Sequence, residues 1–267
     1  MTEHGLVSGE VAPPDWKAMD DFAAGIDGNR LPRSTGLRGT ELTIAEDGAA
    51  ALTLAFQDGE TVAWRRADGS SGTDWYEAVE VRPDVHYLTV KDQTNPLRAA
   101  VIVVNHGTGR TLTVTSDIAE GPTPGRPRVS QTFVPGVLAG AEPGGAEPAP
   151  SRDLIGLRAL YRYSPNHLYE HVYLSSERYA WQCIVGEQRG HGDVDLTTTW
   201  GLGDDLYVFT FREFLIPVAA TWLYDFAALR STGTFVGLGG DGSVLVAPGG
   251  AHITLLDRVS YPDAQPV

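Results

Sequence analysis

The chain consists largely of short segments in which apolar and polar residues alternate with a period of two, separated by turn-forming residues. Asp58-Gly59 joins two such segments and is typical of a tight hairpin, and Asp241-Gly242 follows another. No long helical period interrupts the alternation between residues 37 and 118, or after residue 154. Strands joined by short turns pair antiparallel, so the sequence predicts an all-β protein.

One short helix is expected, near the N-terminus. Residues 15–25 begin with an aspartate, end at a glycine, and place Trp16, Met19 and Phe22 on one face at helical spacing. We expect this helix to cover one end of a barrel or sheet.

The two alternating regions are similar to each other, which predicts two antiparallel barrels in tandem. The matching pieces are Gly36-Leu37-Arg38 with Gly156-Leu157-Arg158, residues 86–92 with 207–213, and residues 111–113 with 232–234. The stretch between the two regions is rich in proline and glycine and is typical of a linker. The predicted parts are an N-terminal segment with the short helix (1–30), barrel 1 (31–118), the Pro/Gly-rich linker (119–152) and barrel 2 (153–260).

The net charge is -14 and the sequence pI is near 4.8. An acidic surface repels phosphate backbones and anionic lipids, so nucleic-acid and membrane partners are disfavoured. The single cysteine, Cys183, excludes an intrachain disulfide and any Cys-rich metal site. Residues 1–18 lack the apolar run of a secretory signal. We therefore expect a soluble cytoplasmic protein, and the sequence leaves a homodimer open.

The most informative strand is Tyr169-Glu170-His171-Val172-Tyr173, because a period of two places Tyr169, His171 and Tyr173 on one face. In a barrel this face would line a pocket with rings and one titratable group, the usual composition of a small-molecule site. His171 would then be a general acid or base with a pKa near neutrality. The alternative is core packing, with His171 bonded to a neighbouring polar group.

Two further strands carry aromatic candidates. Tyr179, Trp181 and Cys183 share a face, and Trp181 could stack on a planar ligand or simply fill a small barrel. Trp222 is a further candidate for contact with the substrate. Cys183 fits a small buried hydrophobe better than a nucleophile, since no basic residue adjoins it in sequence.

Arg212 and Glu213 end an apolar strand, and adjacent strand residues face opposite sides, so only one of them can point inward. An inward Arg212 would bind a carboxylate or phenolate, whereas an inward Glu213 would act as an acid. The remaining alternative is a strand-end pair at the barrel rim.

His191, Asp193 and Asp195 alternate by two and, together with His171, could hold a divalent metal. A solvated strand end explains this spacing better, so no metal site is predicted. The chain also has no GxGxxG after a strand, no P-loop, no HExxH and no GxSxG, and we therefore expect no cofactor.

The chain resembles the MoaF family, named for molybdenum cofactor biosynthesis protein F, whose two domains are lipocalin-like. The residues that carry this resemblance in the second half are 161–165, 169–174, Tyr179, Trp181, Cys183, Gly186, 205–207, 211–213, Pro217 and 232–233; in the first half they are Gly36, Leu37, Trp64, 76–79, Val81 and Arg82. The second half is also similar in pattern to the phenolic acid decarboxylases, which are single lipocalin-like barrels. The decarboxylase segment that follows the aromatic strand is not reproduced here.

Two functions remain open from the sequence. The first is a cofactor-independent isomerase, cyclase or lyase of secondary metabolism that acts on a small aromatic or polyunsaturated molecule. Its predicted catalytic residues are His171, Glu213 and Arg212, and its predicted substrate-binding residues are Tyr169, Tyr173, Tyr179, Trp181 and Trp222. The second is a non-catalytic small-molecule binder or a molybdenum-cofactor accessory protein, as the family resemblance implies.

Overall fold

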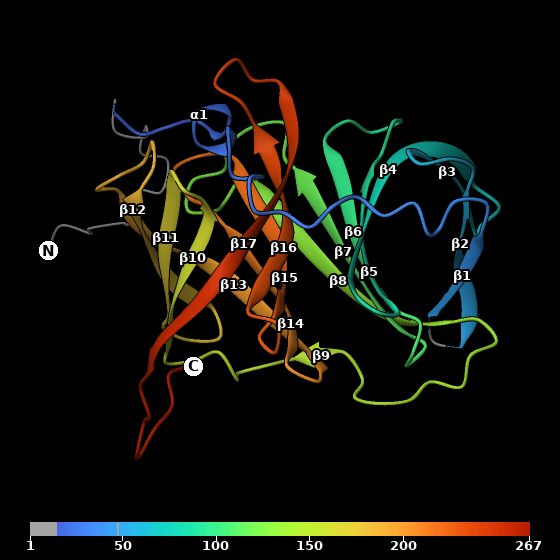
Figure 1. Cartoon of the computed structure of the whole chain (residues 1–267). Coiled ribbons are helices and arrows are strands. Elements are labelled where there is room, and N and C mark those ends of the chain that lie inside the picture. Colours follow the sequence, from blue (N-terminus) through green and yellow to red (C-terminus); the bar gives the residue numbers. More distant parts are fainter. Residues whose placement is uncertain (1–14, 47) are drawn as a thin grey trace, which may run out of the picture.

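The computed structural model describes residues 15–46 and 48–267, so residues 1–14 of the expected N-terminal segment lie outside the described part. The described chain is nearly all β, with one short helix (Figure 1). The elements are α1 (Met19–Ala23), β1 (Glu41–Glu46), β2 (Ala49–Phe56), β3 (Thr61–Arg66), β4 (Ser71–Arg82), β5 (Val85–Lys91), β6 (Arg98–Asn105), β7 (Arg110–Ile118), β8 (Val129–Leu138), β9 (Ala149–Pro150), β10 (Leu157–Ser164), β11 (His167–Tyr173), β12 (Arg178–Val185), β13 (Gly192–Gly203), β14 (Leu206–Arg212), β15 (Val218–Asp225), β16 (Arg230–Leu238) and β17 (Val244–Arg258).

The first barrel is an antiparallel meander of eight strands, β1 to β8, that closes when β8 pairs with β1. The structure differs here from the expected boundaries, since β8 comes from the stretch assigned to the linker. It pairs with β7 along its whole length, from Ile118 opposite Val129 to Arg110 opposite Val137. The prolines and glycines of this stretch are typical of a linker, but ten of its residues form a strand that contains Pro135 and Gly136.

The second barrel repeats this plan with eight strands, β10 to β17. It closes by two pairings, β10 with β17 and β12 with β13, and the two-residue strand β9 adds to β13 outside the ring. The expected all-β fold of two tandem lipocalin-like barrels is confirmed. The pieces 86–92 and 207–213, matched in the sequence, form the fifth strand of each barrel and continue one residue past it.

The two barrels pack side by side, with the outer faces of β5 to β8 against those of β14 to β16 (Figure 1). Aliphatic side chains of both barrels share two buried clusters there. The Tyr87 hydroxyl donates to the Thr221 carbonyl at 2.7 Å across this contact. Arg82 binds both carboxylate oxygens of Asp225, at 2.6 and 2.7 Å. Buried apolar area and a bidentate ion pair therefore join the barrels directly.

The helix α1 lies over one end of the second barrel, at the upper left of Figure 1. Met19 and Phe22 on its inner face are buried, as is Ile26 just beyond it. The helix is shorter than expected, because it begins only at Met19, after Ala18 in an extended conformation. The chain turns at Gly25, which adopts a positive φ of 87°, in agreement with the expected end. The predicted role is confirmed by these contacts, since the helix covers a barrel end.

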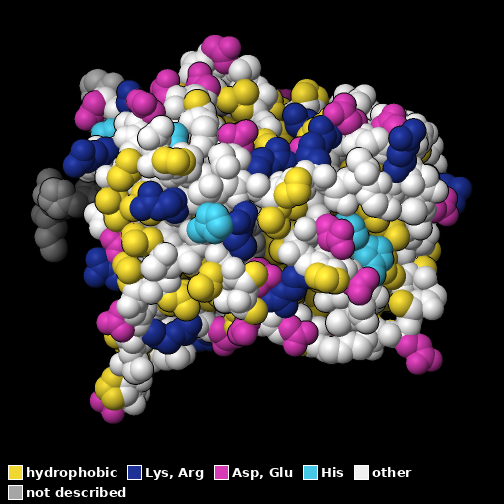
Figure 2. Space-filling model, in the orientation of Figure 1, with side chains coloured by type: hydrophobic (Ala, Val, Ile, Leu, Met, Phe, Trp, Pro, Cys, Tyr) yellow, Lys and Arg dark blue, Asp and Glu magenta, His cyan; other side chains and the backbone are white. Residues whose placement is uncertain are grey.

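Acidic and basic side chains are interspersed on the face shown in Figure 2, and hydrophobic side chains gather over the second barrel. Among the described residues, no helix is long and apolar enough to cross a membrane.

Candidate active site in the second barrel

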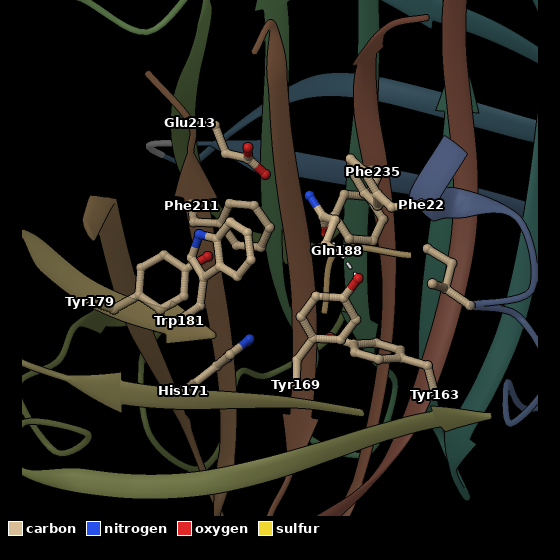
Figure 3. A pocket seen from close by; sticks show the side chains of 11 residues that line it. Phe22, Tyr163, Tyr169, His171, Tyr179, Trp181, Gln188, Phe211, Glu213 and Phe235 are labelled. Atoms are coloured by element: carbon tan, nitrogen blue, oxygen red, sulfur yellow. Dashed lines mark hydrogen bonds between the residues drawn. The ribbon is translucent and has the colours of Figure 1, made fainter. Parts of the chain in front are cut away.

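A small cavity lies at the end of the second barrel that α1 covers (Figure 3). Its free volume is about 30 Å³, which is room for a water molecule or two. The lining side chains are Phe22, Ile26, Tyr163, Tyr169, His171, Tyr179, Trp181, Gln188, Phe211, Glu213 and Phe235. They come from α1 and the turn after it, from five strands, from the loop between β12 and β13, and from the residue after β14.

Five of the eight residues singled out in the sequence line this cavity: Tyr169, His171, Tyr179, Trp181 and Glu213. The structure places Tyr173 and Trp222 elsewhere in the barrel. Tyr173 exchanges a 2.6 Å hydrogen bond with the Tyr161 hydroxyl. Trp222 is fully buried against Gly233, where an added Cβ would lie 2.1 Å from the indole. Both are on inward faces, but they pack in the core and do not line the cavity.

Arg212 is outside the cavity, on the outer face of the barrel. Its guanidinium donates to Gln131 Oε1 of β8 at 3.2 Å and to Thr198 Oγ1 at 3.1 Å. Burial lowers the pKa of Arg212 to about 10. Alternation along the strand leaves one inward position for the pair, and Glu213 occupies it. Arg212 therefore contributes to the contact between the barrels and does not reach the cavity.

His171 is buried among rings. Tyr161 lies 4.3 Å from it and Tyr179 5.2 Å, centroid to centroid. Its Nδ1 has no hydrogen-bond partner among the described residues. Burial lowers the pKa of His171 to about 3, because no charged group near it offsets the cost of desolvating an imidazolium. The near-neutral pKa expected from the sequence is therefore not found, and burial favours the neutral imidazole of His171.

Glu213 and Asp195 form a buried acidic pair. Burial raises the pKa of Glu213 well above its ordinary value, and the charge of Asp195 adds to the shift. Burial also raises the pKa of Asp195, to about 7. Glu213 side-chain atoms face the cavity (Figure 3), and no side-chain hydrogen bond to a described residue holds its carboxyl. Burial therefore favours the uncharged form of Glu213 at the cavity wall.

Asp195 fixes the indole that forms one wall. Trp181 Nε1 donates to Asp195 Oδ2 at 2.8 Å, and the Phe214 amide donates to Oδ1 at 3.4 Å. Trp16, just before α1, packs edge-to-face on Trp181 with ring centroids 6.0 Å apart. Asp195 is fully buried, so the solvated strand end expected at this position is wrong.

Gln188 is the polar cavity residue that the sequence analysis missed. Its Oε1 accepts from the Tyr169 hydroxyl at 2.9 Å, whereas its Nε2 has no partner among the described residues. It lies in an irregular loop, where no periodicity indicates which side chains turn inward. Cys183 is buried, and burial raises the pKa of its thiol, in keeping with the hydrophobic role expected of it.

His191 lies outside the cavity. Its ring stacks on Trp16 with centroids 4.9 Å apart, and its Nε2 lies 3.5 Å from an Asp15 carboxylate oxygen. Within residues 15–46 and 48–267, no three His, Cys, Asp or Glu side chains are grouped so that they could hold a metal ion.

Tandem eight-stranded barrels with a ring-lined cavity and buried titratable groups define a double lipocalin-like barrel protein. The chain belongs to the MoaF family: the model of the MoaF N-terminal domain matches residues 14–120 and that of the MoaF C-terminal domain matches residues 148–259. Protein MoaF of Klebsiella aerogenes is 32% identical over 249 residues, covering 88% of this chain and 92% of the relative.

Among solved structures, a “putative beta-lactamase” from Burkholderia vietnamiensis is 15% identical, with a TM-score of 0.34 over 39% of this chain and 95% of that one. This likeness is too low to bear on function.

Proposed function

We propose that the second barrel is the active site of a cofactor-independent acid–base enzyme. Its substrate would be a small aromatic or polyunsaturated molecule, and its reaction an isomerisation, cyclisation or lyase step. The observation that carries the proposal is the buried carboxyl of Glu213, which has a raised pKa and no side-chain hydrogen bond to a described residue, at the wall of a ring-lined cavity. Titratable groups whose pKa values are moved this far cluster at functional sites.

Glu213 is suited to donate a proton. Because burial raises its pKa, this acid keeps its proton closer to neutral pH and is available to donate it to an alkene carbon or a carbonyl oxygen of a bound substrate. The resulting carboxylate takes a proton back when the rearranged product loses one, so the residue ends as it began. Asp195, whose pKa is about 7, tunes this acid through its charge.

His171 and Gln188 are suited to orient the substrate. His171 Nδ1 and Gln188 Nε2 are buried polar atoms without partners among the described residues, and such atoms are costly unless a ligand or water bonds them. Both side chains line the same cavity as Glu213 (Figure 3). A substrate with one polar group would satisfy them while its apolar body packs on Trp181 and Phe211.

Entry requires movement of α1, because about 30 Å³ does not accommodate an aromatic molecule. Phe22 and Ile26 reach the cavity from α1 and the turn after it, and the helix has only five residues. Lids of this kind open on the microsecond to millisecond scale and exclude water when closed.

The test follows proton transfer directly. The protein is incubated in D₂O with a panel of small alkenes, aryl ketones and 4-hydroxycinnamate, and deuterium incorporation and product formation are followed by NMR. We expect turnover of at least one compound, and a loss of about 100-fold or more in Glu213→Gln, as is typical when a general acid is removed.

Arg212→Gln is the matched control, since this neighbouring side chain lies outside the cavity. It should retain the wild-type rate. Binding of a compound to the wild type and to Glu213→Gln with no conversion by either would instead establish a non-catalytic binding protein. A role in molybdenum-cofactor biosynthesis stays a prediction, because the names of the matched family and of its relative state no activity.

A further inference from the structure

The first barrel encloses a much larger cavity than the one described in the second. Its free volume is about 280 Å³, close to the lower end of ordinary small-molecule sites. The floor is apolar and includes Leu54, Val90 and Ile102. Charged side chains of both signs line it near the strand ends, from β1, β3, β4 and β6 and from the residue after β5; they are Glu46, Arg66, Asp74, Asp92 and Arg98.

Three of these side chains repeat the arrangement of the second barrel. Asp74 of β4 lies opposite Val62 of β3, two residues before Trp64, just as Asp195 of β13 lies opposite Tyr179 of β12, two residues before Trp181. The residue after the fifth strand is an acid in both barrels. It is Asp92 in the first barrel and Glu213 in the second. The tryptophan, the aspartate and the second acid are therefore at equivalent positions.

The polar atoms of the first barrel lack the internal pairing found in the second. Trp64 Nε1 is buried and makes no well-formed hydrogen bond to a described residue, although Trp64 lies close enough to Asp74 to lower the pKa of that carboxyl, whereas Trp181 Nε1 is bonded to Asp195 at 2.8 Å. Asp74 is buried and accepts a hydrogen bond from the Gln93 amide to Oδ1 at 3.0 Å. A buried indole N–H without a well-formed hydrogen bond calls for a ligand or water at that position.

Asp92 is the anionic member of the acid pair. Burial would raise its pKa, but hydrogen bonds from Thr94 and Asn95 outweigh that effect and lower it. Burial, together with the Asp92 charge, raises the pKa of Asp74. A cation placed between these carboxyls would be stabilised by Asp92 and would draw Asp74 into its charged form.

Two arginines bring positive charge to the same cavity. The Arg66 guanidinium lies 4.7 Å above the Trp64 ring, and Arg66 is exposed, so its donors are free to bind an anion. Arg98 bonds Asp117 through Nε at 2.7 Å, and its side chain is 40% exposed. The rim therefore presents carboxylates beside guanidinium groups, above an apolar floor.

We propose that the first barrel is a second ligand site, which binds a small zwitterion with a flat apolar body, an ammonium group at Asp74 and Asp92, and a carboxylate at Arg66. Trp64 Nε1 would donate to the same carboxylate. A ligand with one charge would gain from either the acids or the arginine, whereas a zwitterion gains from both. This site does not depend on the activity proposed for the second barrel.

Calorimetric titration with three matched probes tests the proposal: L-phenylalanine, 3-phenylpropionate, which lacks the ammonium, and phenethylamine, which lacks the carboxylate. We expect L-phenylalanine to bind about tenfold tighter than either analogue, as one charge-assisted hydrogen bond predicts. Equal affinity of all three, tighter binding of a singly charged analogue, or no binding of L-phenylalanine would overturn the proposed ligand class.

Variants locate the site. Arg66→Gln, at an exposed rim position that poses no threat to folding, should weaken L-phenylalanine about tenfold but leave phenethylamine unchanged. Asp74→Asn should weaken phenethylamine and leave 3-phenylpropionate unchanged. Trp75→Phe, which removes an indole on the outer face of β4 under Lys91, is the matched control and should bind like wild type. Loss of binding in Trp181→Phe, with Arg66→Gln unaffected, would assign the ligand to the second barrel and overturn the proposal.

Discussion

The two barrels share one plan and one set of polar positions, yet the cavity among these positions is much larger in the first barrel than in the second. Both have eight strands in the same order, and both carry a tryptophan, an aspartate and a second acid at equivalent positions. The free volume of this cavity is about 280 Å³ in the first barrel and about 30 Å³ in the second, where a separate pocket of about 400 Å³ is lined by Leu157, Tyr207 and Phe226. The shared topology therefore determines where the polar side chains lie. The volume of the cavity is determined by the other inward-facing residues.

The residues that make this difference can be paired through the strand registers. Four inward positions of β5 and β6 are aliphatic, and their equivalents on β14 and β15 are aromatic: Leu88, Val90, Ile102 and Val104 correspond to Phe209, Phe211, Trp222 and Tyr224. Each exchange adds ring volume to a barrel of the same strand number. Aliphatic filling of the first barrel leaves room for a molecule, whereas rings occupy most of that room in the second.

The largest effect on stability is expected from removing one of the rings that fill the second barrel. Trp222→Ala removes a fully buried indole and should lower the free energy of unfolding by about 4 kcal/mol, through lost burial and the cavity left behind. Ile102→Val at the equivalent position should lower it by about 1 kcal/mol. Urea denaturation measures both. Similar losses in the two barrels would refute the contrast in filling.

A smaller effect is expected in how stability depends on pH, which compares Asp195 of the second barrel with Asp74 of the first. Burial raises the folded pKa of Asp195 to about 7, so the folded protein binds more protons than the unfolded chain between about pH 4 and that value. Stability should therefore fall as pH rises through this range. Asn is neutral at every pH in this range. The free energy of unfolding of Asp195→Asn, relative to that of the wild type, should therefore rise by about 2 kcal/mol from pH 4 to pH 7.5.

Thermal melting across this pH range provides the measurement, with Asp74→Asn as the counterpart in the first barrel. Burial raises the pKa of Asp74 too, so its variant should show the same sign. We expect a weaker dependence there, because the exposed Arg66 and Arg98 show that this rim meets solvent. A melting difference for Asp195→Asn that stays flat with pH would show that Asp195 is charged in the folded protein.

The smallest expected effect is the difference in stability between removing the indole N–H of Trp181 and removing that of Trp64. Trp181→Phe removes the hydrogen bond to Asp195 and should cost about 1.5 kcal/mol, since a buried carboxyl loses its donor. Trp64→Phe removes an N–H that makes no well-formed hydrogen bond to a described residue, and should change stability by less than about 0.5 kcal/mol. Chemical denaturation of both variants measures their free energies of unfolding. An equal loss of stability in the two variants would show that Trp64 Nε1 also has a hydrogen-bond acceptor.

Much of the fold could be predicted from the sequence because period-two alternation and turn residues act locally. They indicate the strands, and the match of 86–92 with 207–213 indicates the repeat. The strand β8 was not predicted, because Pro135 and Gly136 interrupt its alternating pattern and its pairing with β7 and β1 depends on contacts distant in sequence. Proline is tolerated within this strand against the usual preference.

The candidate site was predictable where alternation decides which side chains share a face. Tyr169 and His171 follow from this rule, and so does the choice between Arg212 and Glu213 once one inward residue is known. Gln188 comes from an irregular loop, so no local pattern indicates it. Helical spacing indicates that Phe22 faces a barrel end, but which residues it meets there depends on tertiary packing. The pKa of His171 depends on how completely the rings around it exclude water, which spacing along a strand does not encode.

The helix that seals the second barrel precedes the first barrel in the chain, so closure of the second barrel depends on an unbroken polypeptide. The match to the C-terminal family domain begins at residue 148, so that domain on its own lacks Phe22 and Ile26. Proteolysis at 139–148 that separated the halves would leave the seal attached to the wrong fragment.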